Sequence, residues 1–288
     1  MSRRAVSPAW VVAALAGWLA TAGNLALWRK LHALGVAASL RDLPFALAIA
    51  AIVGGATAML LGAFAWRATL KPVATLLLAT AALASYFMLA YGVVIDGGMM
   101  TNALQTDWRE TAALASWQMA AVLVVLGLLP AWLLWRQPVA YGGMVRQASR
   151  SLLLVAAGLL LVVGAGLLAF QPFASLMRNH KEVRYLFNPL ATVYAAARVA
   201  ARPWAGPQRP LVHVGEGAGL GPLPASSQAR PRVLLLVLGE TARSDNFSIN
   251  GYARATTPEL ARLGVVSFRN AWSCGTSTAA SVPCMFSD

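Results

Sequence analysis

The stretch Leu152–Phe170 reads LLLVAAGLLLVVGAGLLAF and contains no charged residue. A helix needs roughly 17–25 mostly apolar residues to cross the hydrocarbon core of a bilayer. Towards the N-terminus, four further runs without a charged residue meet the same requirement: Ala112–Leu134, Val73–Val94, Leu43–Phe64 and Pro8–Leu27. The sequence therefore predicts a transmembrane domain of five helices within residues 1–172.

The composition excludes an ordinary soluble protein. The 288 residues are 58% hydrophobic and 11% charged, whereas a soluble domain carries about 25% charged residues. The net charge of +13 could indicate nucleic-acid binding. The arginines lie mainly between the apolar runs, however, and not in a basic and aromatic patch. We therefore interpret many of them as cytoplasmic loop charges and lipid headgroup contacts, and expect no nucleic-acid partner.

The basic residues between the spans predict the orientation of the chain. With the N-terminus inside, the inside segments hold seven lysines and arginines and the outside loops hold four. Cytoplasmic loops carry the excess of such residues, which favours this orientation. The first run is long for a signal peptide and is followed by Arg29 and Lys30, so we interpret it as a retained anchor. Five spans then place everything after Phe170 outside.

The loop between the third and fourth spans carries a polar constellation. Asn102, Thr106 and Glu110 are spaced at i, i+4 and i+8, so they would share one face if the loop were a single helix. A carboxylate with two neutral hydrogen-bonding groups suits an ammonium or ethanolamine headgroup. The alternative is a solvated helix whose polar face has no specific role.

Residues 173–231 are predicted to be a juxtamembrane segment and a linker. Basic and aromatic residues mix up to Val199 and are interrupted by Pro189, which favours two short amphipathic helices on the outer membrane face. In this segment His180 is more typical of a headgroup contact than of a metal ligand. Residues 202–231 are rich in Pro, Gly, Ala and Ser, as in a linker.

Residues 232–288 are predicted to be the incomplete start of an α/β domain. Val233–Leu238 is a continuous apolar run, as in a strand buried on both faces of a parallel sheet. Glu240 follows at its carboxyl end, either as a hard oxygen ligand for a divalent metal or as the acid of a helix N-terminus. Asn250-Gly251 predicts a turn, Pro258–Leu263 a short helix, and Val265–Phe268 a second strand.

The segment SCGTSTAASVPCMFS, Ser273–Ser287, places four hydroxyl residues between the two cysteines of the chain. Its hydroxyls are those of Thr276, Ser277, Thr278 and Ser281, next to an expected helix start. A hydroxyl at a helix N-terminus is well placed to act as a nucleophile, because the local N–H groups favour developing negative charge. Cys274 and Cys284 would lie in an oxidising compartment, which favours a disulfide over two buried thiols.

The chain resembles the bacterial phosphoethanolamine transferases that modify lipid A, the group that includes the mobile colistin-resistance enzymes. Five segments carry the resemblance, in order along the chain: Asn102–Asp107 (NALQTD), Arg178–Pro189 (RNHKEVRYLFNP), Gly239–Arg243 (GETAR), Asn246–Tyr252 (NFSINGY) and Ser273–Ser287. The resemblance implies five membrane helices followed by a periplasmic zinc hydrolase domain of the alkaline phosphatase and sulfatase type.

Residue roles follow from the resemblance by position. Among the four hydroxyls it singles out Thr278 as the nucleophile. It implies Glu240 and Thr278 as zinc ligands, a disulfide between Cys274 and Cys284, and headgroup contacts from Asn102, Thr106 and Glu110. Further zinc ligands of the family find no match, so we expect a truncated chain that is inactive by itself.

The resemblance also implies the partners and the location. Phosphoethanolamine would pass from phosphatidylethanolamine to a lipid A phosphate in the bacterial inner membrane, with the C-terminal part in the periplasm, and would confer polymyxin resistance. One alternative is a related transferase that acts on the lipopolysaccharide core or another acceptor. Another is a non-enzymatic membrane remnant; a transporter is disfavoured, because the five spans carry no charge.

Overall fold

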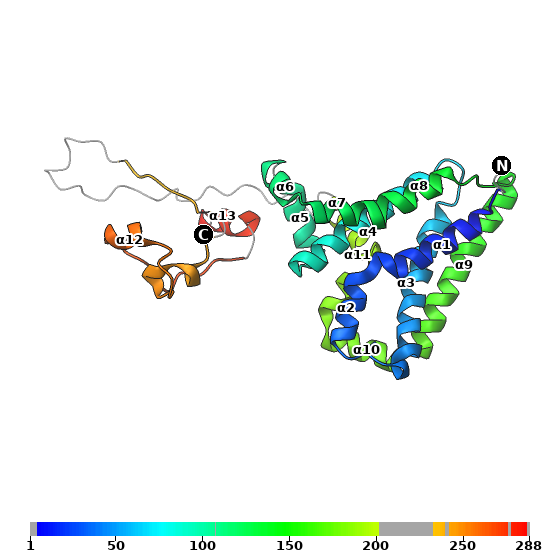
Figure 1. The fold of residues 1–288 in the computed structure, drawn as a ribbon, viewed down its shortest axis with the longest axis horizontal. Helices are drawn as coiled ribbons and strands as arrows, with labels where there is room; N and C mark the ends of the chain where they lie inside the picture. The colour runs from blue at the N-terminus through cyan, green and yellow to red at the C-terminus, as the bar shows by residue number, and fades with distance from the viewer. Residues whose placement is uncertain (1–4, 107, 202–232, 240–241, 276–277, 287–288) are drawn as a thin grey trace, which may run out of the picture. The chain divides into compact units, whose positions relative to one another are not determined.

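The structure is a computed structural model that describes residues 5–106, 108–201, 233–239, 242–275 and 278–286. The chain divides into two compact units, Met1–Gly206 and Pro207–Asp288. This division falls within the predicted linker, while the domain limits at residues 172 and 231 stay predictions. Figure 1 labels the helices of both units.

Among the described residues, five helices are long and apolar enough to cross a membrane. They are Pro8–Ala33, made of α1 (Pro8–Ala20), η1 (Ala22–Asn24) and α2 (Leu25–Ala33); Leu40–Ala63, made of η2 (Leu40–Asp42) and α3 (Leu43–Ala63); α4 (Leu70–Tyr91); Trp117–Arg136, made of α7 (Trp117–Val122), η3 (Leu123–Leu128) and α8 (Leu129–Arg136); and α9 (Met144–Leu168). Each predicted run overlaps one of these helices, so the prediction of five spans is confirmed.

Local capping explains two of the helix starts. Ser7 caps α1 by accepting a hydrogen bond from the backbone N–H of Trp10, and Pro8 follows at the first helical position. The fourth span begins at Trp117 and not at the predicted Ala112. The reason is Ser116, whose hydroxyl accepts the N–H of Met119 at 3.1 Å and starts a new helix there.

Close backbone contact joins α3 to α9, which run side by side in Figure 1. A Cβ atom built on Gly158 would lie 2.6 Å from the carbonyl oxygen of Gly55, and one on Gly55 would lie 2.8 Å from the carbonyl oxygen of Gly158. Farther along, the Ser151 hydroxyl donates to the Gly62 carbonyl. In lipid, small residues let helices approach closely and hydrogen bonds join them, so these residues fix the α3–α9 pair.

The loop between the third and fourth spans is two short helices, α5 (Gly97–Gln105) and α6 (Trp108–Leu114). The condition of a single helix through this loop is not met, because the backbone of Thr106 is extended, with φ −65° and ψ 130°. The Thr106 hydroxyl instead donates to the Asn102 carbonyl at 2.8 Å and closes the end of α5. The three predicted headgroup residues therefore do not share one helical face.

A buried polar network holds the segment after the fifth span against the bundle. This segment comprises α10 (Phe170–Asn179), η4 (Lys181–Leu186) and α11 (Leu190–Ala201). Between η4 and α11, Asn188 is fully buried; its N–H donates to Asn24 Oδ1 at 2.8 Å, and its carbonyl accepts from Asn24 Nδ2 at 2.6 Å. Ser85 of α4, also fully buried, donates to the Gly23 carbonyl at 2.8 Å. The network joins the first and third spans to the base of α11.

In the second unit the described helical elements are η7 (Ser244–Asn246), η8 (Ser248–Asn250), α12 (Pro258–Arg262) and α13 (Thr278–Met285). The predicted turn is confirmed by Gly251, whose φ is 105°, and the predicted short helix is α12. The two predicted strands are wrong for this structure, because Val233–Leu238 and Val265–Phe268 adopt no strand in the described residues. A strand needs the backbone groups of a neighbour; here the side chains of Val233–Leu238 are 50–93% exposed.

Candidate active site

The predicted nucleophile lies at the start of a helix. Thr278 is the first residue of α13 and its side chain is exposed. Helix N-termini present unsatisfied backbone N–H groups and a positive partial charge, which stabilise an anion or a transferring phosphoryl group. The described geometry is therefore compatible with a nucleophilic role, and the role itself stays a prediction.

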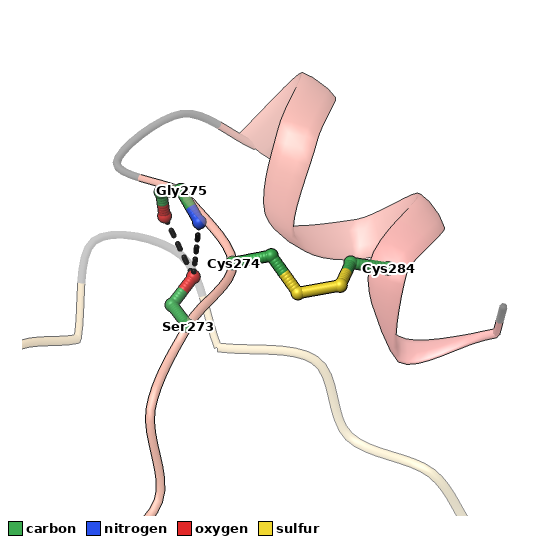
Figure 2. Close-up of a disulfide and its surroundings, with 4 residues drawn as sticks. All are labelled: Ser273, Cys274, Gly275 and Cys284. Atoms are coloured by element: carbon green, nitrogen blue, oxygen red, sulfur yellow. Dashed lines mark hydrogen bonds between the residues drawn. A yellow bond between two sulfur atoms is a disulfide. The ribbon is translucent and has the colours of Figure 1, made fainter. Parts of the chain in front are cut away.

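A disulfide ties this helix to the loop before it. Cys274 precedes α13 and Cys284 lies near its C-terminal end, with 6.4 Å between their Cα atoms (Figure 2). The predicted disulfide is confirmed. Because the bond closes the loop onto the helix, it restricts where the start of α13, and so the Thr278 hydroxyl, can move.

A tight turn adds to this restraint. The Ser273 hydroxyl donates to the Gly275 carbonyl at 2.6 Å and accepts the Gly275 N–H at 3.3 Å, as Figure 2 shows. A Cβ atom on Gly275 would lie 2.8 Å from the Cβ of Ala280 in the first turn of α13. Here glycine lets the loop pack directly against the helix.

Hydroxyl and amide groups also fix the loop that contains the Asn246–Tyr252 segment. The hydroxyls of Ser248 and Thr257 lie 2.9 Å apart, and Ser267 donates to Asn250 Oδ1 at 2.6 Å. These groups bond to one another inside the second unit. The segment therefore has a clear structural role in shaping the loop.

The predicted zinc site is not assembled by the described residues. Glu240 lies outside them, and among the rest no group of three or more His, Cys, Asp or Glu side chains could hold a metal ion. A protein zinc site needs three or four such ligands. The described residues thus do not fit zinc by themselves, and we derive no chemical step through a metal.

The predicted headgroup residues belong to the first unit of the chain, whereas Thr278 belongs to the second. Asn102 is exposed and Thr106 is half-buried, while the side chain of Glu110 lies outside the description. His180, expected to be a headgroup contact, has its Nδ1 3.7 Å from Glu182 Oε1, which also pairs with Lys30 Nζ at 3.1 Å.

Sequence reasoning missed a cavity of about 570 Å³ at the start of α5. Asp96, Arg184 and Arg198 line it, together with residues of η4 and α11. The sequence signal for it is two arginine–tyrosine pairs close in sequence, Arg184 with Tyr185 and Arg198 with Tyr194, whose side chains contact each other in the structure.

The comparison with known proteins identifies the family. Residues 53–203, slightly more than half of the chain, match the family described as phosphoethanolamine transferase EptA/EptB. The chain belongs to this family. Residues 232–288 match the sulfatase family. Together these matches confirm the predicted fold class of five transmembrane helices followed by part of a sulfatase-like domain.

Relatives of the EptA/EptB family are similar along most of the chain. The chain is 37% identical to phosphatidylethanolamine transferase Mcr-1 of Escherichia coli, and the match covers 99% of this chain and 53% of the length of Mcr-1. Phosphoethanolamine transferase EptA of Escherichia coli K12 is 39% identical, over 79% of this chain and 41% of the relative. The chain therefore spans about half the length of the curated relatives it matches.

A solved structure supports the same fold. The integral membrane protein lipooligosaccharide phosphoethanolamine transferase A (EptA) from Neisseria meningitidis superposes with a TM-score of 0.85 at 30% identity. The match covers 99% of this chain and 53% of the solved one. This EptA/EptB chain is accordingly a membrane protein.

Proposed function

We propose that the protein transfers phosphoethanolamine from phosphatidylethanolamine to a phosphate of lipid A through a covalent intermediate on Thr278. Family membership supports the reaction type. The observation that carries the role of Thr278 is its exposed position at the first residue of α13, in a loop closed by the disulfide.

The reaction has two displacements at one phosphorus atom. In the first, Thr278 Oγ forms a bond to the phosphorus, the bond to the glycerol oxygen breaks, and diacylglycerol leaves with the proton of the threonine hydroxyl. In the second, a lipid A phosphate oxygen forms the new bond, the Thr278 Oγ–phosphorus bond breaks, and Thr278 Oγ takes up the proton of the lipid A phosphate, which restores the hydroxyl. The N–H groups at the start of α13 are suited to stabilise the charge on the phosphoryl oxygens in both steps.

Zinc remains a prediction from the resemblance, with Glu240 and Thr278 as two of its ligands. Bound zinc would supply Lewis-acid stabilisation of phosphoryl charge. Two ligands are too few for a closed site. We therefore expect the 288 residues purified alone to contain far less than one zinc per chain, measured by elemental analysis.

We propose an inner-membrane location with the N-terminus in the cytoplasm and the part after α9 in the periplasm. The excess of inside basic residues supports this orientation, and so does a disulfide in the second unit, since disulfides persist in oxidising compartments. Reporter fusions after residues 36 and 206 test it. A reporter active only in the cytoplasm at either position would contradict the proposal.

A chimera tests the transfer directly. Residues 1–288 would replace the matching half of Escherichia coli Mcr-1, and lipid A would be analysed by mass spectrometry in cells that express the chimera. We expect added phosphoethanolamine and a raised polymyxin tolerance. Thr278→Ala should abolish both, whereas Ser281→Ala, which removes another hydroxyl of the same helix, should preserve them.

Two results would contradict the assignment. If Thr278→Ala kept full transfer, Thr278 would not be the nucleophile. If the unsubstituted chimera folded and reached the membrane but modified no lipid A, the acceptor would be wrong, and phosphoethanolamine on the lipopolysaccharide core would then favour the alternative acceptor.

A further inference from the structure

A cavity of the first unit gathers separated opposite charges. Its lining includes Asp96, directly before α5, Arg184 of η4 and Arg198 of α11. In the described part of the chain, no ion pair joins Asp96 to either arginine, and no described carboxylate pairs with Arg184 or Arg198. A pocket that keeps both signs of charge available suits a ligand that itself carries both signs.

Tyrosine rings orient the two arginines. The guanidinium carbon of Arg184 lies 4.7 Å from the ring centroid of Tyr185, and that of Arg198 lies 5.9 Å from the ring centroid of Tyr194. Arg184 Nη2 donates to the Tyr185 hydroxyl at 2.8 Å, which fixes the guanidinium and leaves its other N–H groups for a ligand. The planar N–H fork of an arginine matches the oxygens of a phosphate. The two arginines that line the cavity are therefore suited to bind a phosphate.

Asp96 is the carboxylate that lines the cavity. Its Oδ1 accepts the N–H of Met99 at 2.8 Å and caps α5. Its other carboxylate oxygen has no hydrogen-bond partner among the described residues. Fixed by its role as a cap, Asp96 offers its other carboxylate oxygen to an ammonium group.

The cavity lies just beyond the ends of the third and fifth spans, where lipid headgroups are expected. Asp96 follows shortly after Tyr91 ends the third span, and η4 and α11 follow the fifth span through α10. Ile95, at the wall of the cavity, packs in the same core as Met88 of the third span and Val183 of η4. Apolar side chains of Phe187 and Leu190 line the cavity as well, as expected where a lipid enters.

We propose that this cavity binds the zwitterionic headgroup of phosphatidylethanolamine, with Arg184 and Arg198 on the phosphate and Asp96 on the ammonium. Its volume of about 570 Å³ is that of an ordinary ligand pocket. Asn102 and Thr106 do not line it, so it is a site separate from the predicted Asn102–Thr106–Glu110 set. The assignment of this lipid as the donor for transfer rests on the proposed function; its binding here does not.

Lipid retention tests the proposal without any turnover. The purified 288-residue chain would be incubated in detergent with equal amounts of phosphatidylethanolamine and phosphatidylglycerol, and bound lipid would be counted by native mass spectrometry. We expect phosphatidylethanolamine to be retained about three- to tenfold more than phosphatidylglycerol, the size of effect given by one hydrogen bond of ordinary strength in a solvent-accessible cavity.

Three variants separate the contributions. Asp96→Asn keeps the cap of α5, because asparagine caps as well as aspartate, and should bring the ratio of the two lipids close to one. Arg184→Gln combined with Arg198→Gln should lower retention of both lipids by about three- to tenfold. Arg178→Gln is the matched control, because Arg178 is an exposed arginine of α10 outside the cavity, and it should match the wild type.

Clear results would overturn the proposal. Equal retention of the two lipids by the wild type, or an unchanged ratio in Asp96→Asn, would remove the ammonium contact. Unchanged retention in the double arginine variant would remove the phosphate contact. Because Thr278→Ala should retain lipid like the wild type, failure of lipid binding and failure of transfer at Thr278 remain distinguishable.

Discussion

A single added methyl group at Gly158 should separate the α3–α9 pair. In Gly158→Ala the new Cβ would meet the Gly55 carbonyl oxygen at 2.6 Å, the Met59 Cγ at 2.7 Å and the Met59 backbone nitrogen at 3.0 Å. Two of these three atoms belong to the backbone and cannot move by a rotamer change. The helices must therefore shift apart by several tenths of an ångström, which weakens the packing on both sides of the contact.

The expected cost is that of overpacking, about 1–3 kcal/mol. Because 1 kcal/mol shifts the melting temperature of a protein of this size by roughly 2–4 °C, Gly158→Ala should lower it by about 2–12 °C. Gly164→Ala is the matched control on the same helix, because a Cβ there would meet no atom within 4 Å. Replacing a helical glycine that has open space for a Cβ by alanine should leave stability unchanged or raise it slightly.

Thermal unfolding of the purified protein in one detergent, followed by circular dichroism, measures both variants under the same conditions. Gly55→Ala should reproduce the loss, since its Cβ would lie 2.8 Å from the Gly158 carbonyl oxygen. If Gly158→Ala and Gly164→Ala melted at the same temperature, the close α3–α9 contact would be refuted as a source of stability.

Two other side chains have predictable effects on the same measurement. Asn24→Ala would leave buried groups of Asn188 without partners and should lower the free energy of unfolding by about 1–3 kcal/mol. Asn179→Ala, at an exposed site, is the control and should lower it little. Equal losses of stability in the two variants would argue against the network. The pKa of Glu182 lies below its ordinary value of 4.5, because its own backbone N–H and then Lys30 bind the carboxylate. A carboxylate whose pKa is lower in the folded state than in the unfolded state stabilises the protein above its unfolded-state pKa. This stabilisation is lost as the pH falls through the folded-state pKa. Glu182→Gln should therefore lower the melting temperature at pH 7 and have a smaller effect below pH 4.5; an effect that grows on acidification would contradict this reasoning.

The sequence was sufficient where one local signal determined the structure. Long uncharged runs predicted the five spans, because the bilayer requires each of them to satisfy its own backbone hydrogen bonds as a helix. Asn250-Gly251 predicted a turn that Gly251 forms with a positive φ, since few other residues adopt it. The cysteine spacing and the expected compartment likewise predicted the disulfide.

Predictions failed where the structure depended on partners that a local pattern does not reveal. The i, i+4, i+8 spacing after the third span assumed one helix, but the Thr106 hydroxyl bonds back to the Asn102 carbonyl and the helix ends there. Val233–Leu238 has the composition of a buried strand, yet a strand is defined by its neighbours, and the described part of the second unit offers it none.

The charged cavity illustrates the same limit at longer range and explains why the two candidate sites differ in predictability. Thr278 is positioned by groups within a few residues of it, namely the start of α13 and the disulfide. The cavity needs Asp96 beside Arg184 and Arg198, which lie far apart in the sequence. Packing of α5 against α11 brings them together, and the buried pairing of Asn24 with Asn188 holds the base of α11 against the bundle. Neither asparagine carries a charge or belongs to a periodic pattern, so a reader of the sequence has no reason to connect them. If the network positions the cavity, Asn24→Ala should weaken retention of phosphatidylethanolamine as well as stability, although Asn24 does not line the cavity.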